Sequence, residues 1–176
     1  MFNRIAGRYD LLNRILSFNQ DQAWRKKTVQ LSDLAPGYKI CDLACGTGDL
    51  TFEYAKKLKS GKVVGIDFSR EMLQKAGLKL KQVRYSVPVK FQWGDIQDLP
   101  FKDQEFDVVS IAFGIRNVSN IAKALQEIKR ILKPGGKLMI LEFSKPPESA
   151  LSPVYHFYRE KILPKVAKLI ISKEYT

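Results

Sequence analysis

From residue 38 onward, the chain alternates between short apolar runs and segments in which apolar residues recur at helical spacing. The apolar runs predict five strands, at residues 38–44, 62–68, 89–95, 106–114 and 137–144. The intervening segments 51–58, 70–85 and 121–132 predict helices, and the "KPGG" at 133–136 predicts a turn that ends the last of them. Strands joined by helical crossovers are typical of the α/β class, here a doubly wound, Rossmann-like parallel sheet.

Two flanking segments differ from this core. Residues 1–35 predict two amphipathic helices that either cover the sheet or close as a lid over a lipophilic ligand. The "APG" at 35–37 follows as a linker. Residues 151–171 also predict helix, interrupted at Pro164. We therefore expect one domain over 1–176, with a helical cover at 1–35, a ligand-binding core at 36–145 and a helical segment at 146–176.

Composition narrows the class of protein. The 45% apolar and 27% charged residues are ordinary for a globular protein, and the longest apolar stretch, 108–115, is too short to span a bilayer. Cys41 and Cys45 are expected to be small buried residues, and His156 is the sole histidine. A zinc site or histidine-based triad is therefore not predicted, no metal is expected, and the location predicted is cytoplasmic.

The net charge of +12 suggests an anionic partner. The basic residues are scattered, however, and no aromatic–basic interleaving of the RNA-binding kind is present. Solvated helix faces are one explanation, and contact with an anionic membrane surface or nucleic acid is the other. Of these partners we expect peripheral contact at the inner face of a membrane, and no nucleic acid.

The stretch "CDLACGTGDL" at 41–50 carries the candidate chemistry. Gly46 and Gly48 follow a predicted strand, but the position where a dinucleotide fingerprint has its third glycine is Thr51. The phosphate-binding P-loop pattern is absent from the whole sequence. A nucleoside cofactor without phosphates fits this loop better, and S-adenosylmethionine (SAM) is such a cofactor.

Acidic residues at strand ends support this interpretation. Asp67 ends the second predicted strand, where a carboxylate accepts hydrogen bonds from both ribose hydroxyls. Asp95 ends the third strand, where it or a backbone group would bind the adenine amine. Asp42 precedes the glycine turn, and its negative charge is compatible with a sulfonium. Together with the glycine loop, these strand ends predict SAM binding.

The sequence also resembles the ubiquinone/menaquinone biosynthesis C-methyltransferase family, a branch of the class I SAM-dependent methyltransferases. "DLACGTGD" and "KPGG" are shared with many methyltransferases, whereas "RYDLLNR", "FGIRNV" and "LEFSKP" are typical of this branch. The resemblance implies methylation of a ring carbon in a polyprenylated quinol. It also implies a chain shortened at its C-terminus, since family members continue with further strands. The cofactor-binding residues that it implies are Asp42, Gly46, Thr47, Gly48, Asp67, Asp95, Ile96 and Ala112.

For the quinol, the resemblance implies Arg116 and Asn117, with Tyr9 beside the substrate. A cation such as Arg116 would stabilise the phenolate that makes a ring carbon nucleophilic. Simpler roles stay open: Arg116 would tie its loop to a carboxylate, Asn117 would cap the helix that starts near Ser119, and Tyr9 would only pack. Also open are a benzoquinol or naphthoquinol substrate, another small-molecule acceptor, a SAM-binding fragment without catalysis, and a homodimer.

Overall fold

The computed structural model describes residues 20–143. The expectations for Tyr9, His156, the first predicted helix and the helix at 151–171 lie outside these residues. The chain divides into two compact units, one comprising Gln22–Glu142 and the other Met1–Asp21 with Phe143–Thr176. The fold described below is that of the first unit.

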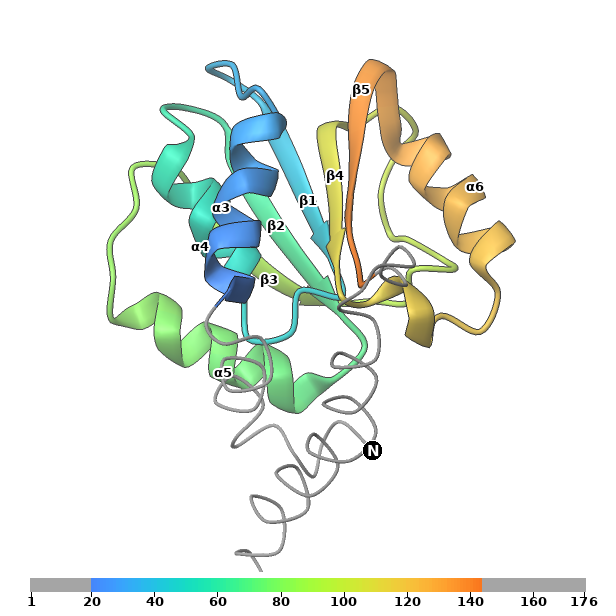
Figure 1. Ribbon diagram of the computed structural model, residues 1–176, viewed down its shortest axis with the longest axis horizontal. Coiled ribbons are helices and arrows are strands. Elements are labelled where there is room, and N and C mark those ends of the chain that lie inside the picture. Colours follow the sequence, from blue (N-terminus) through green and yellow to red (C-terminus); the bar gives the residue numbers. More distant parts are fainter. Residues whose placement is uncertain (1–19, 144–176) are drawn as a thin grey trace, which may run out of the picture. The chain divides into compact units, whose positions relative to one another are not determined.

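Five parallel strands form one sheet within the described residues, in the order β3-β2-β1-β4-β5 (Figure 1). The strands are β1 (Lys39–Leu43), β2 (Lys62–Asp67), β3 (Val89–Trp93), β4 (Phe106–Ala112) and β5 (Leu132–Leu141). The strand order reverses direction at β1, which is the arrangement of a doubly wound sheet. The predicted fold class is therefore confirmed.

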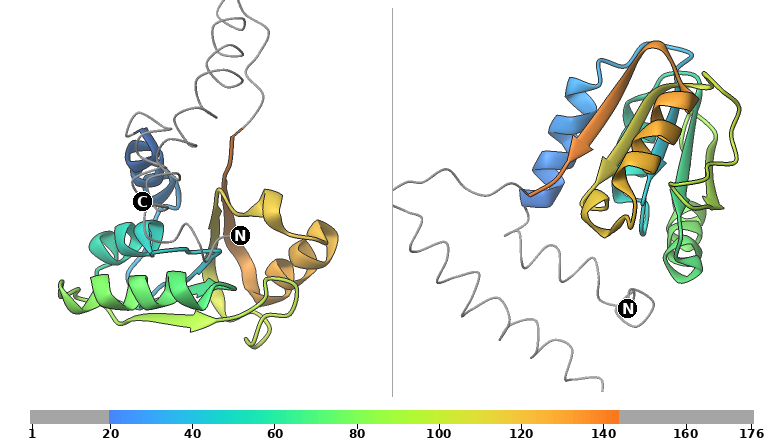
Figure 2. Two further views of the ribbon diagram at one scale, coloured as in Figure 1. Left: turned by 90° about the horizontal axis from the view of Figure 1, so that it is seen from below. Right: turned by 90° about the vertical axis from the view of Figure 1, so that its right-hand side faces the viewer.

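Helices cover both faces of this sheet. Crossovers run through α4 (Asp49–Lys57) between β1 and β2, α5 (Arg70–Lys81) between β2 and β3, and α6 (Ile121–Ile131) between β4 and β5. Because right-handed crossovers in opposite directions along a sheet use opposite faces, α6 lies on the other face from α4 (Figure 2). A further helix, α3 (Gln20–Leu31), precedes β1 and lies on the α4 face.

Two hydrophobic clusters flank the sheet, and the strands contribute alternate residues to each. Ile40 and Val108 pack with Leu50 and Tyr54 of α4, whereas Leu43 and Ile111 pack with Ile128 of α6. Alternate side chains of a strand point to opposite faces, so strands buried on both faces need a nearly continuous apolar run. This is the physical origin of the apolar runs in the sequence.

The structure differs from the sequence prediction most clearly at "KPGG". Helix α6 already ends at Ile131, and Leu132 is extended. The register of β5 against β4 then jumps, since Leu132 pairs with Phe106 and Lys137 pairs with Val108. The predicted turn is therefore an irregularity inside β5, two residues beyond the helix end, and Gly135 supplies its positive φ of 77°.

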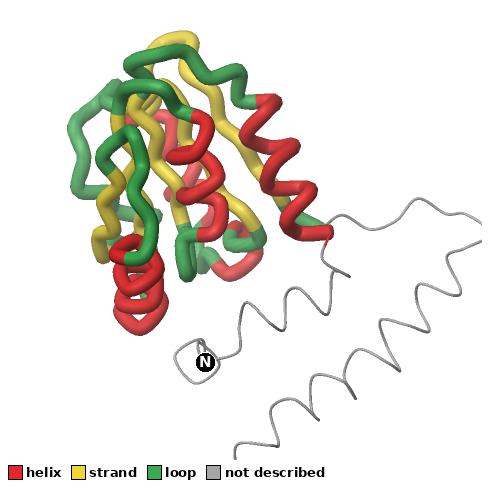
Figure 3. The backbone as a smooth tube through the Cα atoms, turned by 90° about the vertical axis from the view of Figure 1, so that its left-hand side faces the viewer, coloured by secondary structure: helices red, strands yellow, loops and turns green. Residues whose placement is uncertain are grey.

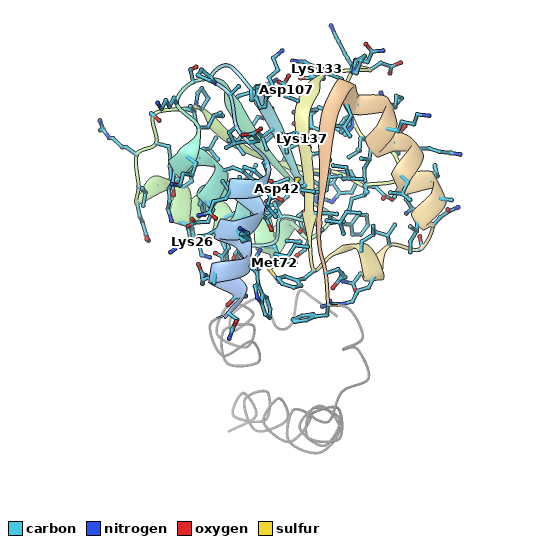
Figure 4. The ribbon with its side chains drawn as sticks, turned by 45° about the horizontal axis from the view of Figure 1, so that its top comes forward. Lys26, Asp42, Met72, Asp107, Lys133 and Lys137 are labelled. Atoms are coloured by element: carbon cyan, nitrogen blue, oxygen red, sulfur yellow. The ribbon has the colours of Figure 1, made fainter. Side chains whose placement is uncertain are left out.

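The two ends of the sheet have different characters. At the amino ends of β4 and β5, Asp107 accepts hydrogen bonds from the backbone N–H of Lys39 and from Lys133, and Lys137 lies near (Figure 4). At the carboxyl ends, the strands lead into the loops drawn green in Figure 3, including the glycine loop. No helix in 20–143 is long and apolar enough to cross a membrane.

Candidate active site

The glycine loop connects β1 to α4 at the carboxyl edge of the sheet. Three of its residues have left-handed backbone conformations: Ala44 (φ 49°), Gly46 (φ 56°) and Gly48 (φ 89°). The backbone N–H of Gly48 donates to the carbonyl of Cys45 at 2.9 Å, which closes the turn directly before α4. Glycine adopts these conformations without strain, whereas Ala44 does so at an energetic cost that is typical of functional loops.

The ring of Phe91 from β3 explains why glycine is required at Gly48 and Gly65. A Cβ atom added at Gly48 would lie 2.7 Å from Cζ of Phe91, and one added at Gly65 would lie 2.7 Å from its Cδ1. The same ring packs edge-on against Phe52 of α4, with 5.5 Å between centroids. The Phe91 ring therefore packs directly against the glycine loop, and a larger residue at either glycine would displace this ring.

Asp67 and Gly46, two of the predicted cofactor-binding residues, are in direct contact. One carboxylate oxygen of Asp67 accepts from the backbone N–H of Gly46 at 2.7 Å, and the other accepts from that of Ser69 at 2.8 Å. Burial raises the pKa of Asp67, although these N–H donors partly oppose the shift. Each carboxylate oxygen has two lone pairs, so this pinned carboxylate can also accept bonds from a ribose diol.

Asp42 lies behind the loop and has a different environment. It is 1% exposed, and its two oxygens accept from the hydroxyls of Thr51 at 2.6 Å and Ser110 at 2.8 Å. Figure 4 labels Asp42, which lies on β1. Burial raises the pKa of Asp42 to about 6, against the opposing effect of the two hydroxyl donors. These contacts favour a supporting role over direct contact with a ligand.

Thr51 replaces the third glycine of a dinucleotide fingerprint, and its buried hydroxyl explains the replacement. The Thr51 side chain is fully enclosed and bonds β1 through Asp42. The start of α4 is therefore held to the sheet by a hydrogen bond to a carboxylate, where a glycine would allow only close packing.

The other predicted cofactor residues occupy neighbouring strand ends. Asp95 follows β3, and its carboxylate accepts from the backbone N–H of Gln97 at 2.9 Å. Ile96 is half-buried against the cluster on the α6 face, and Ala112 at the end of β4 is half-buried against the opposite cluster. Parallel strands place these residues at the same edge as Asp67 and the glycine loop.

Arg116 and Asn117 lie in a short 3₁₀ helix, Ile115–Asn117, directly after β4. Arg116 forms an ion pair with Glu142, which follows the end of β5. A Cβ added at Gly114 would lie 2.5 Å from that of Ala44, so this segment packs directly against the loop after β1. The structure therefore brings the Arg116 segment beside the glycine loop.

One alternative role for Asn117 is wrong. The residue that caps α6 is Asn120, whose side-chain oxygen accepts from the backbone N–H of Lys123 at 3.0 Å. Asn117 is exposed and three residues earlier, in the 3₁₀ turn. The cap falls at Asn120 because α6 begins at Ile121, where the predicted helix 121–132 also begins.

Two charged residues of the site were missed by sequence reasoning. Glu142 follows β5 in the same way that Asp67 and Asp95 follow their strands, so the strand-end pattern contained a signal for it. Lys79 of α5 donates to the hydroxyl of Thr47 at 2.8 Å and to Asp49 at 2.9 Å. Lys79 had no local signal, because its partners are 32 and 30 residues away in the sequence.

The arrangement fits SAM. Asp67 offers acceptors for a ribose beside the glycine loop, and the cation Lys79 is offset by the anion Asp49 at that loop. Because Asp49 offsets Lys79 and Asp67 adds a negative charge, the loop suits the zwitterionic amino-acid end of SAM better than the two negative charges of a diphosphate. Both cysteines are buried and not in a disulfide, as expected from the sequence, and burial raises their thiol pKa values well above the ordinary range.

Comparison with known proteins agrees with this assignment. The whole of residues 1–176 matches the ubiE/COQ5 methyltransferase family. The ubiquinone/menaquinone biosynthesis C-methyltransferase UbiE of Geotalea daltonii is 44% identical over 96% of this chain and 72% of its own length. That of Hydrogenovibrio crunogenus is 42% identical over 99% of this chain and 69% of its own length.

Solved structures show the same fold. A methyltransferase in complex with the Haloferax volcanii activator Trm112 superposes with a TM-score of 0.68 at 26% identity, covering 80% of this chain and 59% of that one. A structure from Methanococcus maripaludis, described as an S-adenosyl-L-methionine-dependent methyltransferase, gives a TM-score of 0.71 at 22% identity, covering 93% of this chain and 74% of that one.

Fold and site together define a class I SAM-dependent methyltransferase, whose cofactor is S-adenosyl-L-methionine. Within that class, the chain belongs to the ubiE/COQ5 methyltransferase family and is a C-methyltransferase.

Proposed function

We propose that this enzyme methylates a ring carbon of a polyprenylated quinol in quinone biosynthesis. The names of its relatives describe those proteins as C-methyltransferases of ubiquinone/menaquinone biosynthesis. The observation that carries the proposal is the ion pair of Arg116 with Glu142, at the ends of adjacent strands and beside the glycine loop. A cation held at this edge suits an acceptor that must become an anion before it reacts.

The chemistry assigned to Arg116 follows from the acceptor. A phenol has a pKa of about 10, so its ring is a weak carbon nucleophile at neutral pH. The guanidinium of Arg116 would stabilise the phenolate oxygen and lower that pKa. Because a guanidinium has five N–H donors in a fixed plane, it can bind Glu142 and a phenolate oxygen together. Glu142, with 19% of its side chain exposed against 51% for Arg116, would orient the cation.

Bound SAM supplies an electrophilic methyl group. We assign its ribose to Asp67, its adenine to Asp95 and Ile96, and its amino-acid end to the glycine loop with Thr47. Ala112, half-buried at the end of β4, is assigned to the cofactor pocket, and the exposed amide of Asn117 is assigned to a second oxygen of the quinol. Asp42 is assigned to holding the loop from behind, through Thr51.

The solubility of the acceptor indicates the cellular location of the enzyme. A polyprenylated quinol partitions into lipid, so we place the enzyme in the cytoplasm with peripheral contact at the inner face of the membrane. The net charge of +12 supports attraction to anionic lipids. Self-association as a homodimer stays a prediction.

The test is a methylation assay with demethylated benzoquinol and naphthoquinol substrates that carry a short isoprenoid tail. Replacing Arg116 by Gln should lower kcat at least a hundredfold and shift the pH–rate profile to higher pH, while the Kd for SAM stays within twofold. Arg116→Lys should recover part of the activity, and Arg84→Gln, an exposed basic residue beyond α5, serves as the charge-matched control.

Two results separate the alternatives. If the protein binds SAM but methylates neither ring, the quinol assignment is wrong and another small-molecule acceptor is favoured. If only a chain extended to the length of its relatives is active, residues 1–176 act as a SAM-binding fragment. Unchanged turnover in Arg116→Gln would remove the proposed role of that residue.

A further inference from the structure

Lys79 connects helix α5 to the glycine loop. Its ammonium nitrogen lies 2.8 Å from Oγ1 of Thr47 and 2.9 Å from Oδ1 of Asp49, the first residue of α4. About a third of the Lys79 side chain is exposed, whereas Thr47 is buried. A lysine in the last turn of α5 therefore reaches the loop that precedes α4, and both of its contacts are charge-assisted.

The contact with Lys79 fixes the direction in which the Thr47 hydroxyl donates. An ammonium group has three hydrogen-bond donors and no acceptor. The Thr47 oxygen must therefore accept from Lys79, and the hydroxyl hydrogen points away from it. Through this contact, Lys79 presents Thr47 as a hydrogen-bond donor at the glycine loop, and a donor selects a ligand group that accepts.

The charges around Thr47 identify what kind of acceptor is favoured. Backbone N–H groups in the first turn of α4 have no acceptor within the helix and favour negative charge, and Asp42 already accepts from that of Thr51. Asp49 in that turn would repel a ligand anion, and Lys79 offsets this repulsion through the ion pair. With Lys79 present, the loop can accept a carboxylate; without it, Asp49 opposes one.

We propose that Lys79 is a positioning residue that holds Thr47 as a donor to the carboxylate of the cofactor's amino-acid end. Lys79 thereby makes the site selective for ligands that carry this carboxylate. The proposal rests on the cofactor site of the proposed function and not on the quinol, so it survives if the acceptor is another molecule.

The experiment compares two ligands by titration calorimetry on the full chain: S-adenosylhomocysteine and its analogue without the carboxylate. In Lys79→Met, binding of S-adenosylhomocysteine should weaken by about 10- to 100-fold, the value of a hydrogen bond to a charged group. Binding of the decarboxylated analogue should stay within twofold. Lys75→Met, one turn earlier on α5 with the same change of charge, should alter neither affinity.

A second variant keeps the test independent of helix packing. Thr47→Val removes the hydroxyl but retains the side-chain shape, and should show the same ligand-selective loss. The double variant should lose little more affinity for S-adenosylhomocysteine than either single variant, because both substitutions remove the same interaction.

Three outcomes would overturn the proposal. Equal weakening for both ligands in Lys79→Met, with a lower thermal midpoint, would show that Lys79 only joins α5 to α4. Unchanged affinities for both ligands would show that it has no part in binding. Additive losses in the double variant would separate Lys79 from Thr47. If the unmodified protein binds neither ligand, the cofactor assignment fails, which is a different result.

Discussion

The buried carboxyl of Asp42 should make the stability of this protein decrease as pH rises toward neutrality. In the folded protein, burial raises the pKa of Asp42 to about 6, whereas an unfolded aspartate has a pKa of about 3.9. Between these values the folded state binds more protons than the unfolded state, so the free energy of unfolding falls with increasing pH. The contribution is complete below pH 4 and is lost as pH rises through 6.

The magnitude follows from the size of the shift. Two pKa units correspond to about 3 kcal/mol, most of which should be lost between pH 4 and pH 7. Because other carboxyls titrate in the same range, the quantity to measure is the difference between the unmodified protein and Asp42→Asn. Urea unfolding followed by circular dichroism, repeated from pH 4 to pH 7.5, gives this difference directly.

Asp42→Asn keeps the shape of the side chain and removes its ionisation. Relative to this variant, the unmodified protein should become less stable by about 2 to 3 kcal/mol as pH rises from 4 to 7. Asp33→Asn is the control for loss of a carboxylate, because Asp33 is 89% exposed. A pH-independent difference, or one that grows in favour of the unmodified protein with rising pH, would show that the hydroxyls of Thr51 and Ser110 outweigh burial.

Three further substitutions, two of them with a matched control substitution, test the local structure by urea unfolding. Gly48→Ala should lower the free energy of unfolding by about 1–2 kcal/mol, because φ is +89° and the new Cβ would lie 2.7 Å from an aromatic ring. Gly77→Ala is the control, because a Cβ at Gly77 of α5 would meet nothing within 4 Å, and it should be neutral or stabilising by up to about 1 kcal/mol. Equal effects at both glycines would contradict the packing argument. Asn120→Ala should cost about 1 kcal/mol through loss of the α6 cap, and no loss would mean that the cap does not form. Arg130→Met should cost about 2 kcal/mol, because its guanidinium donates to two backbone carbonyls and two carboxylates, while Lys129→Met should change stability by less than about 0.5 kcal/mol.

Local patterns in the sequence determined the architecture. Continuous apolar runs predicted strands buried on both faces, and helical spacing between them predicted the crossovers; from these the parallel sheet follows. The glycine loop could also be recognised from the sequence, because its pattern consists of adjacent residues. Gly46 and Gly48 adopt left-handed conformations in the loop after β1. Asp67 could be placed beside that loop because parallel strands end at a common edge.

Only the tertiary structure decided which polar groups pair. The sequence suggested Asp42 as a ligand contact, yet one of its carboxylate oxygens accepts a hydrogen bond from Ser110, which is 68 residues away. The pairs Lys79–Thr47 and Arg116–Glu142 likewise join elements that no local pattern connects. The physical reason is that helix–sheet packing sets which side chains meet, whereas periodicity reports only which face of an element is buried. The sequence therefore located the site, and packing assigned the partners of its charges.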